Sequence, residues 1–251
     1  MRDLTVADHV AAIHREGGLM AAAVARGDLD ATVPTCPDWT LRELAHHLGR
    51  THHWASAYVE QARPEPLSTE EEQAAWGEMP ADSELVDWYR GANARLVAAL
   101  RAAPADLACW SFLPASSPLA FWARRQAHET AIHRADAQGC SGPVDPVPAD
   151  FAVDGIDELL MCFYNRRSRR LRSDEPRTLA VRTGPTSWLV HIGPDGPRTE
   201  RGDGPADCAV QGEASHLYFA LWNRAKLTDF VVSGDLAVID LWTANATVRW
   251  S

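Results

Sequence analysis

The stretch FWARRQAHETAIHRADAQ, residues Phe121 to Gln138, decides how the first half of this chain folds. It contains HETAIH, which is one residue longer than the zinc-protease motif H-E-x-x-H. Successive residues of an α-helix lie about 100° apart, so His128 and His133, five positions apart, point about 140° away from each other. Glu129 and His133 are four positions apart and share a face. The spacing excludes the protease motif and predicts Glu129 and His133 as ligands of one metal ion.

Helix signals recur throughout the first 140 residues. Thr40 and Glu43 have the spacing of a capping box, and Thr5 with Asp8 has it in a weaker form. Pro118 stands where proline commonly begins a helix. The predicted helices cover residues 5–26, 40–62, 82–102 and 117–139, and loops connect them. Four such helices joined by loops predict a bundle.

The composition changes beyond residue 140. GCSGPVDPVPAD is typical of a linker, and a helix over 149–172 that can pack on the bundle follows it. RTLAVRTG, TSWLVHIG and ADCAVQG are predicted strands, and EASHLYFALWNRA and GDLAVIDLWTA are predicted helices. The sequence therefore predicts an α+β fold, with a four-helix bundle over residues 1–145 and a smaller α+β domain over residues 146–251.

Charge and cysteine usage narrow the class of protein. The net charge of −10 over 251 residues argues against a nucleic-acid partner, and no apolar run is long enough to cross a membrane. The N-terminus lacks the basic start and apolar core of a signal peptide. Five scattered cysteines without a C-x-x-C motif predict a reduced, cytoplasmic protein. Cys36, in PTCPDW, is predicted to be a structural thiol rather than a nucleophile.

Two ligands are too few for a tight metal site, which usually has three protein ligands. The second predicted helix contains four histidines, His46, His47, His52 and His53. His47 shares the apolar stripe of Leu44 and Leu48, so it is predicted to face the bundle interior. The predicted site is therefore His47, Glu129 and His133. The alternative is that these residues are hydrogen-bonded polar groups of the core.

Two motifs, in this order, resemble a known family. VPTCPDWTLRELAHHLGRTHHWA and FWARRQAHETAIHRADAQ are similar to segments of the actinobacterial mycothiol-dependent maleylpyruvate isomerase family. The stretch VQGEASHLYFALWNRAKLTDFVVSGDLAVIDLW resembles the second domain of that family. The resemblance covers nearly the whole chain. It implies a DinB-like N-terminal domain and a sterol-carrier-like C-terminal domain.

The resemblance also implies a function. The metal triad of the family corresponds to His47, Glu129 and His133, and its functional arginine in the second domain corresponds to Arg224 in ALWNRA. The implied activity is a mycothiol-using isomerase or thiol transferase that acts on a small electrophilic substrate similar to maleylpyruvate. Zinc is the expected divalent metal, although nickel and iron also suit two histidines and a carboxylate. Arg224 would hold a substrate carboxylate.

Other functions and roles remain open from the sequence. A non-catalytic protein that binds a metal or ligand would keep the same scaffold, and a metal-assisted hydrolase would hold water in place of a thiol. Asp136, one turn after His133, is a candidate to support the metal site. Arg124 and Arg125 are expected to form structural ion pairs or to bind an anion. Trp39, next to the Thr40 cap, is predicted to be part of a hydrophobic staple.

Overall fold

The structure is a computed structural model that describes residues 3–165 and 170–246. The chain divides into two compact units, one over Leu4–Asp145 and the other from Pro146 onward. The first unit is mainly helical, and the second contains a mixed five-stranded sheet with helices. The predicted α+β fold, with a helical N-terminal domain and a smaller α+β domain after it, is confirmed.

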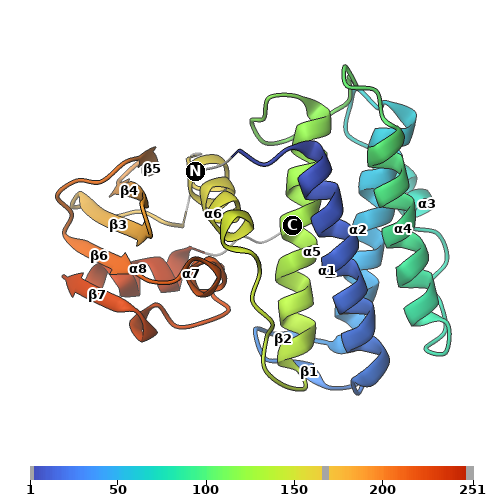
Figure 1. Cartoon of the computed structure of the whole chain (residues 1–251), viewed down its shortest axis with the longest axis horizontal. Coiled ribbons are helices and arrows are strands. Elements are labelled where there is room, and N and C mark those ends of the chain that lie inside the picture. The colour runs from blue at the N-terminus through green and yellow to red at the C-terminus, as the bar shows by residue number, and fades with distance from the viewer. Residues whose placement is uncertain (1–2, 166–169, 247–251) are drawn as a thin grey trace. The chain divides into compact units, whose positions relative to one another are not determined.

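Four long helices lie side by side in the first unit (Figure 1). They are α1 (Val6–Arg26), α2 (Leu41–Gln61), α4 (Leu85–Ala102) and α5 (Pro118–Gly139). The capping boxes predicted from Thr5 with Asp8 and from Thr40 with Glu43 are both formed, and Pro118 begins α5. Each box binds backbone amides that a helix start leaves without intrahelical partners, which stabilises the helix by about 1 kcal/mol.

Helix α5 is the central helix of the first unit. It packs against α1 and α2, and most of its residues are buried. The buried residues include charged ones: Arg125, Glu129, Arg134 and Asp136. A charged side chain removed from water is costly unless it is paired, so α5 must hold its charges in contact with partners.

An aromatic cluster fixes the start of α5 against α2. The fully buried ring of Trp122 stacks on Tyr58, with ring centroids 4.9 Å apart. Its indole N–H donates a hydrogen bond to the carbonyl of Trp110, 2.9 Å away, which ties the preceding loop to the same place. Because a buried aromatic pair is rigid, this contact sets the register of α5 along α2.

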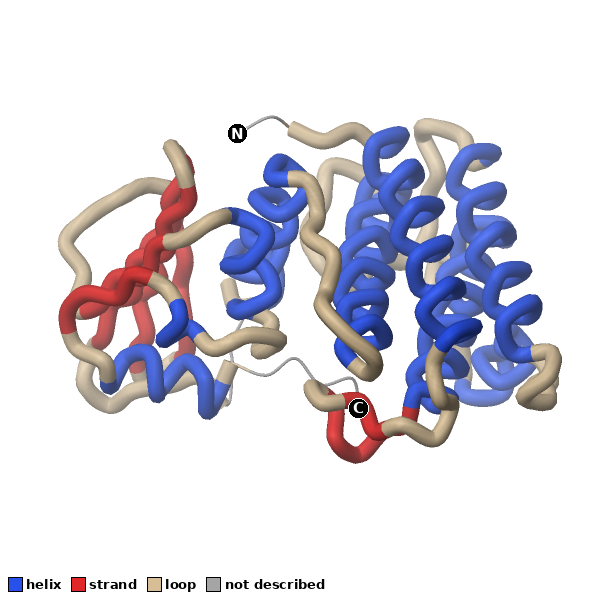
Figure 2. The backbone as a smooth tube through the Cα atoms, turned by 60° about the horizontal axis from the view of Figure 1, so that its bottom comes forward, coloured by secondary structure: helices blue, strands red, loops and turns tan. Residues whose placement is uncertain are grey.

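Two short elements lie in segments predicted to be loops. A hairpin of β1 (Thr32–Val33) and β2 (Cys36–Thr40) connects α1 to α2, and its two strands form a sheet of their own (Figure 2). The helix α3 (Thr69–Trp76) follows the Pro-rich segment, and Ser68 caps it. The prediction of loops alone was wrong here because both elements are too short to show a hydrophobic period.

The second unit begins with α6 (Ala149–Asp157) and a π-helix, Glu158–Phe163. The helix predicted over 149–172 is therefore too long at its C-terminal end. Residues 166–169 of that prediction lie outside the described residues. The first turns after Pro148 bury Phe151, Ile156 and Leu160, and this apolar stripe explains why the segment is helical.

The sheet has the strand order β5-β4-β3-β6-β7, in which β3 and β6 are parallel and the other neighbours are antiparallel. Its strands are β3 (Arg177–Thr183), β4 (Thr186–Gly193), β5 (Gly196–Arg201), β6 (Cys208–Gln211) and β7 (Val231–Gly234). The sequence predicted β3, β4 and β6 and missed β5 and β7. The helix α7 (Ala214–Leu221) lies within its predicted segment, and α8 (Ala237–Asn245) ends one residue beyond its own.

One face of this sheet forms the core of the second unit. Val181 pairs with Trp188 and Val210, and Leu179 pairs with Val190, so these side chains project from the same face. All five are fully buried. Alternate residues of a strand share a face, so the period of two in RTLAVRTG and TSWLVHIG explains this core. Within the described ranges, no helix is both long and apolar enough to span a bilayer.

Candidate metal centre

The structure brings His47, Glu129 and His133 together, as the sequence predicted. His47 comes from α2 and the other two come from α5. One carboxylate oxygen, Oε1 of Glu129, lies 3.2 Å from Nε2 of His133 and 3.5 Å from Nε2 of His47. The ligand atoms of the three residues all lie within 4.8 Å of one another. Three donor atoms from two helices therefore converge on one point.

The ring of His133 is held in one orientation by Asp136. Nδ1 of the imidazole lies 2.9 Å from Oδ2 of Asp136, which is buried. The hydroxyl of Thr35, in the β1–β2 hairpin, donates to the other oxygen of Asp136 at 2.5 Å. Because a carboxylate can only accept, the Nδ1 atom of His133 must carry a proton, and Nε2 faces Glu129. Such carboxylate–histidine pairs are typical of metal sites.

Burial and ion pairing shift the pKa values of Glu129 and His133 in opposite directions. Burial raises the pKa of Glu129, but the imidazoles of His133 and His47 and the guanidinium of Arg125 outweigh it and hold the pKa well below its usual value. Burial lowers the pKa of His133, but Asp136 and Glu129 outweigh it and raise the pKa to about 9. Burial lowers the pKa of His47. At neutral pH the site therefore holds an ionised Glu129, a protonated His133 and a neutral His47.

The donor set fits a divalent metal. Two ligands about 2.0–2.1 Å from a tetrahedral zinc ion are about 3.3 Å apart. The separations of 3.2 Å and 3.5 Å from Glu129 Oε1 to the two Nε2 atoms match this value. Nε2 of His47 is also buried and makes no hydrogen bond within the described residues. A metal ion that replaced the proton of His133 would give this atom a partner and leave one coordination position for another ligand.

Trp39 forms one wall of the site, a role that the sequence did not suggest. Its ring centroid lies 4.7 Å from that of His47 and 6.2 Å from that of His133, on which it stacks. The side chain of His47 is 26% exposed, whereas those of His133 and Glu129 are 10% and 7% exposed. His47 is therefore the most exposed of the three predicted ligands.

The other histidines of α2 do not join the triad. Nε2 of His52 lies 3.0 Å from the hydroxyl of Thr130, and His52 is fully buried. His46 and His53 each contact the ring of Trp88, at centroid distances of 6.0 Å and 5.6 Å. The most buried histidine of α2 is thus His52, whereas the apolar-stripe argument placed His47 deepest. His47 lies at the edge of the core.

A second residue that sequence reasoning did not assign to the site is Arg125. It is 1% exposed, and its Nη2 lies 3.3 Å from Oε2 of Glu129, one turn further along α5. Of the two outcomes expected for Arg125, the structure shows an ion pair. The spacing of four residues between Arg125 and Glu129 was the signal that could have identified this pair.

Arg224 lies in the second unit, in the turn after α7. Its backbone N–H donates to the carbonyl of Phe219 at 2.8 Å, and its Nη1 donates to the carbonyl of Trp222 at 2.7 Å. Asn223, directly before it, has a left-handed backbone with φ of 61°. These contacts hold a half-buried guanidinium close to the C-terminal end of α7.

Comparisons with known proteins agree with this architecture. The family model for the mycothiol maleylpyruvate isomerase N-terminal domain matches residues 10–138, and the model for the MDMPI C-terminal domain matches residues 150–241. A crystal structure of the mycothiol-dependent maleylpyruvate isomerase is similar in fold, with a TM-score of 0.66 and 16% identity over 92% of this chain and 94% of that one. A histidine-to-alanine mutant of that enzyme gives a TM-score of 0.65 and 15% identity with the same coverage. A search of curated proteins found no match.

The two family models together cover both units. The N-terminal match contains the converging residues His47, Glu129 and His133, and the C-terminal match contains Arg224. The likeness to the crystal structures, at these identities, establishes the fold. The family resemblance of the sequence motifs is confirmed, and this chain belongs to the mycothiol maleylpyruvate isomerase family.

Proposed function

We propose that this protein is a divalent-metal-dependent enzyme that uses mycothiol to isomerise, or to add a thiol to, a small electrophilic substrate similar to maleylpyruvate. The convergence of His47 Nε2, Glu129 Oε1 and His133 Nε2 carries this proposal. Membership of the family supports the thiol and the class of reaction. Zinc is the proposed metal, and Ni²⁺ or Fe²⁺ would suit the same ligands.

The residues at this site have different proposed roles. A divalent cation held here lowers the pKa of a bound thiol, so that the sulfur is available as a thiolate near neutral pH. His47, Glu129 and His133 supply three ligands and leave one position for that sulfur. Asp136 accepts a hydrogen bond from the Nδ1–H of His133 and keeps Nε2 directed at the site. Trp39 covers the imidazoles on one side and limits the approach of water.

The substrate is proposed to be a small carboxylate with an electrophilic double bond. Isomerisation by this route requires addition of the sulfur to one alkene carbon, rotation about the resulting single bond and elimination of the thiol. Arg224 is proposed to hold the substrate carboxylate, because a guanidinium can bind a carboxylate with two parallel hydrogen bonds. A cytoplasmic location, predicted from the cysteine usage, would keep the thiol reduced.

Metal content measured by elemental analysis tests the ligand set. We expect about one equivalent in the wild-type protein and almost none in His47→Ala, because two remaining ligands are too few for a tight site. His46→Ala is the matched control, since His46 is adjacent on α2 and contacts Trp88 instead of the triad. Glu129→Gln should also lower the metal content. Equal metal in His47→Ala and the wild type would refute the triad.

Thiol dependence separates the proposed enzyme from a hydrolase or a non-catalytic binding protein. The metal-loaded protein should isomerise maleylpyruvate only when mycothiol is present, whereas a hydrolase would need no thiol. Arg224→Gln should raise the KM for the carboxylate substrate on the order of ten-fold or more, because a charged hydrogen bond is lost. Its metal content should not change. Turnover without a thiol would contradict the proposal.

A further inference from the structure

The two oxygens of the Glu129 carboxylate have different neighbours. Oε1 faces the Nε2 atoms of His133 and His47, at 3.2 Å and 3.5 Å. Oε2 faces the guanidinium of Arg125, at 3.3 Å. Both side chains of this ion pair are almost completely buried, at 1% and 7% exposure. The ion pair thus fixes which oxygen faces the imidazoles.

We propose that Arg125 is a positioning residue that keeps Glu129 a one-oxygen ligand. This inference rests on the proposed function, because it assumes a cation at the triad. A carboxylate can bind a cation through one oxygen or through both. With Oε2 held by the guanidinium, only Oε1 is presented to the cation. The coordination position that Oε2 would otherwise occupy stays open for the sulfur of the thiol.

The charge of Arg125 acts in the same direction. With a divalent cation at the triad, the contacting groups Glu129 and Asp136 would carry two negative charges, and the cation and Arg125 would carry three positive ones. This set would therefore have one net positive charge. An anionic sulfur ligand would neutralise it. Without Arg125 the set would already be neutral, so it would attract a thiolate less strongly.

The structural alternative is that Arg125 only balances the buried charge of Glu129. That role predicts that removing Arg125 destabilises the carboxylate and reduces metal binding and thiol binding together. The positioning role predicts that the two properties separate. Metal binding persists because Oε2 becomes free to act as an additional ligand, whereas thiol binding weakens because the open position is filled.

Cobalt(II) loaded into the full chain gives the necessary readouts. Competition with a chelator measures metal affinity, and the visible absorption of cobalt reports its coordination number, because four-coordinate cobalt absorbs more strongly than five-coordinate cobalt. Titration with 2-mercaptoethanol, followed by sulfur-to-cobalt charge-transfer absorption, measures thiol affinity. The variants are Arg125→Met, which removes the guanidinium, and Arg125→Lys, which keeps a cation. Arg124→Met is the matched control, because it makes the same change one residue earlier on α5.

For Arg125→Met we expect cobalt affinity within about ten-fold of the wild type and a thiol dissociation constant that rises on the order of ten-fold or more. Arg125→Lys and Arg124→Met should stay within about three-fold of the wild type in thiol affinity. If Arg125→Met does not fold, Arg125→Gln takes its place, since it removes the charge and keeps a polar end. The same weakening of thiol binding is expected for it.

Two results would overturn the inference while leaving the proposed function intact. The first is wild-type thiol affinity in the folded variant that lacks the guanidinium. The second is loss of cobalt binding from that variant, which would mean that Arg125 supports the ligands as a whole. A wild-type protein that binds no cobalt would refute both the proposed function and this inference. That outcome differs from the other two because the wild type itself would show no cobalt spectrum.

Discussion

Nδ1 of His133 lies 2.9 Å from Oδ2 of Asp136, three residues further along α5. This contact joins the candidate metal centre to the β1–β2 hairpin, because Thr35 donates to the second oxygen of Asp136. The imidazole is therefore oriented by a chain of hydrogen bonds that begins outside the helix. Thr35 orients Asp136, and Asp136 orients His133. The orientation of His133 therefore depends on a loop about one hundred residues earlier in the sequence.

Replacing Asp136 by Asn should weaken metal binding by about 10- to 100-fold, because the neutral amide no longer raises the basicity of His133 or fixes its ring. Metal affinity measured by chelator competition is the readout. Asp38→Asn, the same change at an exposed position on β2, should have no effect. An unchanged affinity in Asp136→Asn would show that His133 does not need this support.

His52 should make the stability of the fold depend on pH. Its Nε2 contacts the hydroxyl of Thr130, which donates to the carbonyl of Gln126, so Nε2 carries the proton and the buried ring is neutral. Burial lowers the pKa of His52 to about 3. In the unfolded chain a histidine has a pKa of about 6.5, so the unfolded state binds more protons between these values.

The sign follows from this difference. The free energy of unfolding should fall as the pH drops from about 6.5 toward 3, with His52 contributing on the order of 1 kcal/mol per pH unit. Chemical denaturation of the wild type and His52→Gln at several pH values measures it. The variant should lose less stability on acidification. Parallel pH profiles for the two proteins would contradict the assignment.

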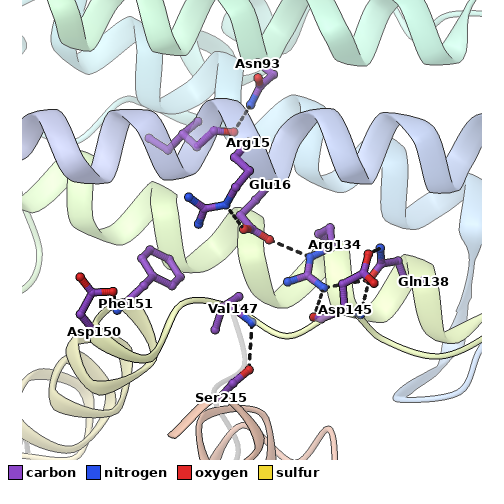
Figure 3. Close-up of polar contacts among 11 residues, drawn as sticks. Arg15, Glu16, Asn93, Arg134, Gln138, Asp145, Val147, Asp150, Phe151 and Ser215 are labelled. Carbon is purple, nitrogen blue, oxygen red and sulfur yellow. Dashed lines mark hydrogen bonds and ion pairs between the residues drawn. The ribbon is translucent and has the colours of Figure 1, made fainter.

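The buried pair of Glu16 and Arg134 should be a major source of stability in the first unit (Figure 3). Nε of Arg134 donates to Glu16 at 2.7 Å, and its Nη1 donates to Gln138 and to the carbonyl of Asp145 at 2.8 Å and 2.6 Å. Arg134→Met removes the buried partner of the Glu16 carboxylate and leaves only the half-exposed Arg15, whose Nε lies 2.9 Å from Oε1. We expect a loss of about 3–5 kcal/mol in the free energy of unfolding.

A second substitution distinguishes the effect of the unpaired charge from the effect of the lost side-chain volume. Adding Glu16→Met to Arg134→Met should recover part of the lost stability, because two apolar side chains leave no buried charge. Urea denaturation of the single and double variants gives the interaction free energy. If the double variant loses at least as much free energy of unfolding as the two single variants lose together, the buried charges are not the cause.

Gly17 and Gly18, adjacent on α1, should respond in opposite ways to alanine. A Cβ at Gly17 would lie 2.3 Å from Nδ2 of Asn93, which donates to the carbonyl of Ile13, whereas a Cβ at Gly18 would meet nothing within 4 Å. Gly17→Ala should destabilise the fold by about 1–3 kcal/mol through overpacking. Gly18→Ala should stabilise it by about 0.5–1 kcal/mol, because alanine loses less backbone entropy in a helix.

Thermal denaturation of both variants measures this contrast. Because the two substitutions are chemically identical, any effect of alanine on the unfolded chain is the same in both. Equal shifts of Tm for the two proteins would mean that Asn93 moves aside without cost.

Local signals in the sequence were sufficient for the bundle. The caps at Thr5 and Thr40 and the proline at Pro118 mark three helix starts, because each satisfies or removes backbone amides within one turn of the chain. The spacing of Glu129 and His133 was also sufficient to place both on one face. The hairpin β1–β2, the helix α3 and the strands β5 and β7 were missed, because short elements carry almost no periodic signal.

Periodicity could not identify the inner face of α5, because this helix is buried on nearly every side. On α2 it likewise did not distinguish His47, at the edge of the core, from His52, at its centre. The contacts of Trp39 with the two imidazoles and of Thr35 with Asp136 depend on how the hairpin folds back on α5. No sequence pattern within the hairpin predicts these contacts.

The sequence by itself determined the four long helices of the bundle, the class of fold and the candidate ligands, because capping and helical spacing are local and act within a few residues of the chain. Only the tertiary structure decided that His47 Nε2 and Glu129 Oε1 lie 3.5 Å apart and that Arg125 holds the other oxygen of Glu129. Those distances depend on the register of α2 against α5. That register is set by packing between residues far apart in the sequence, such as Trp122 on Tyr58.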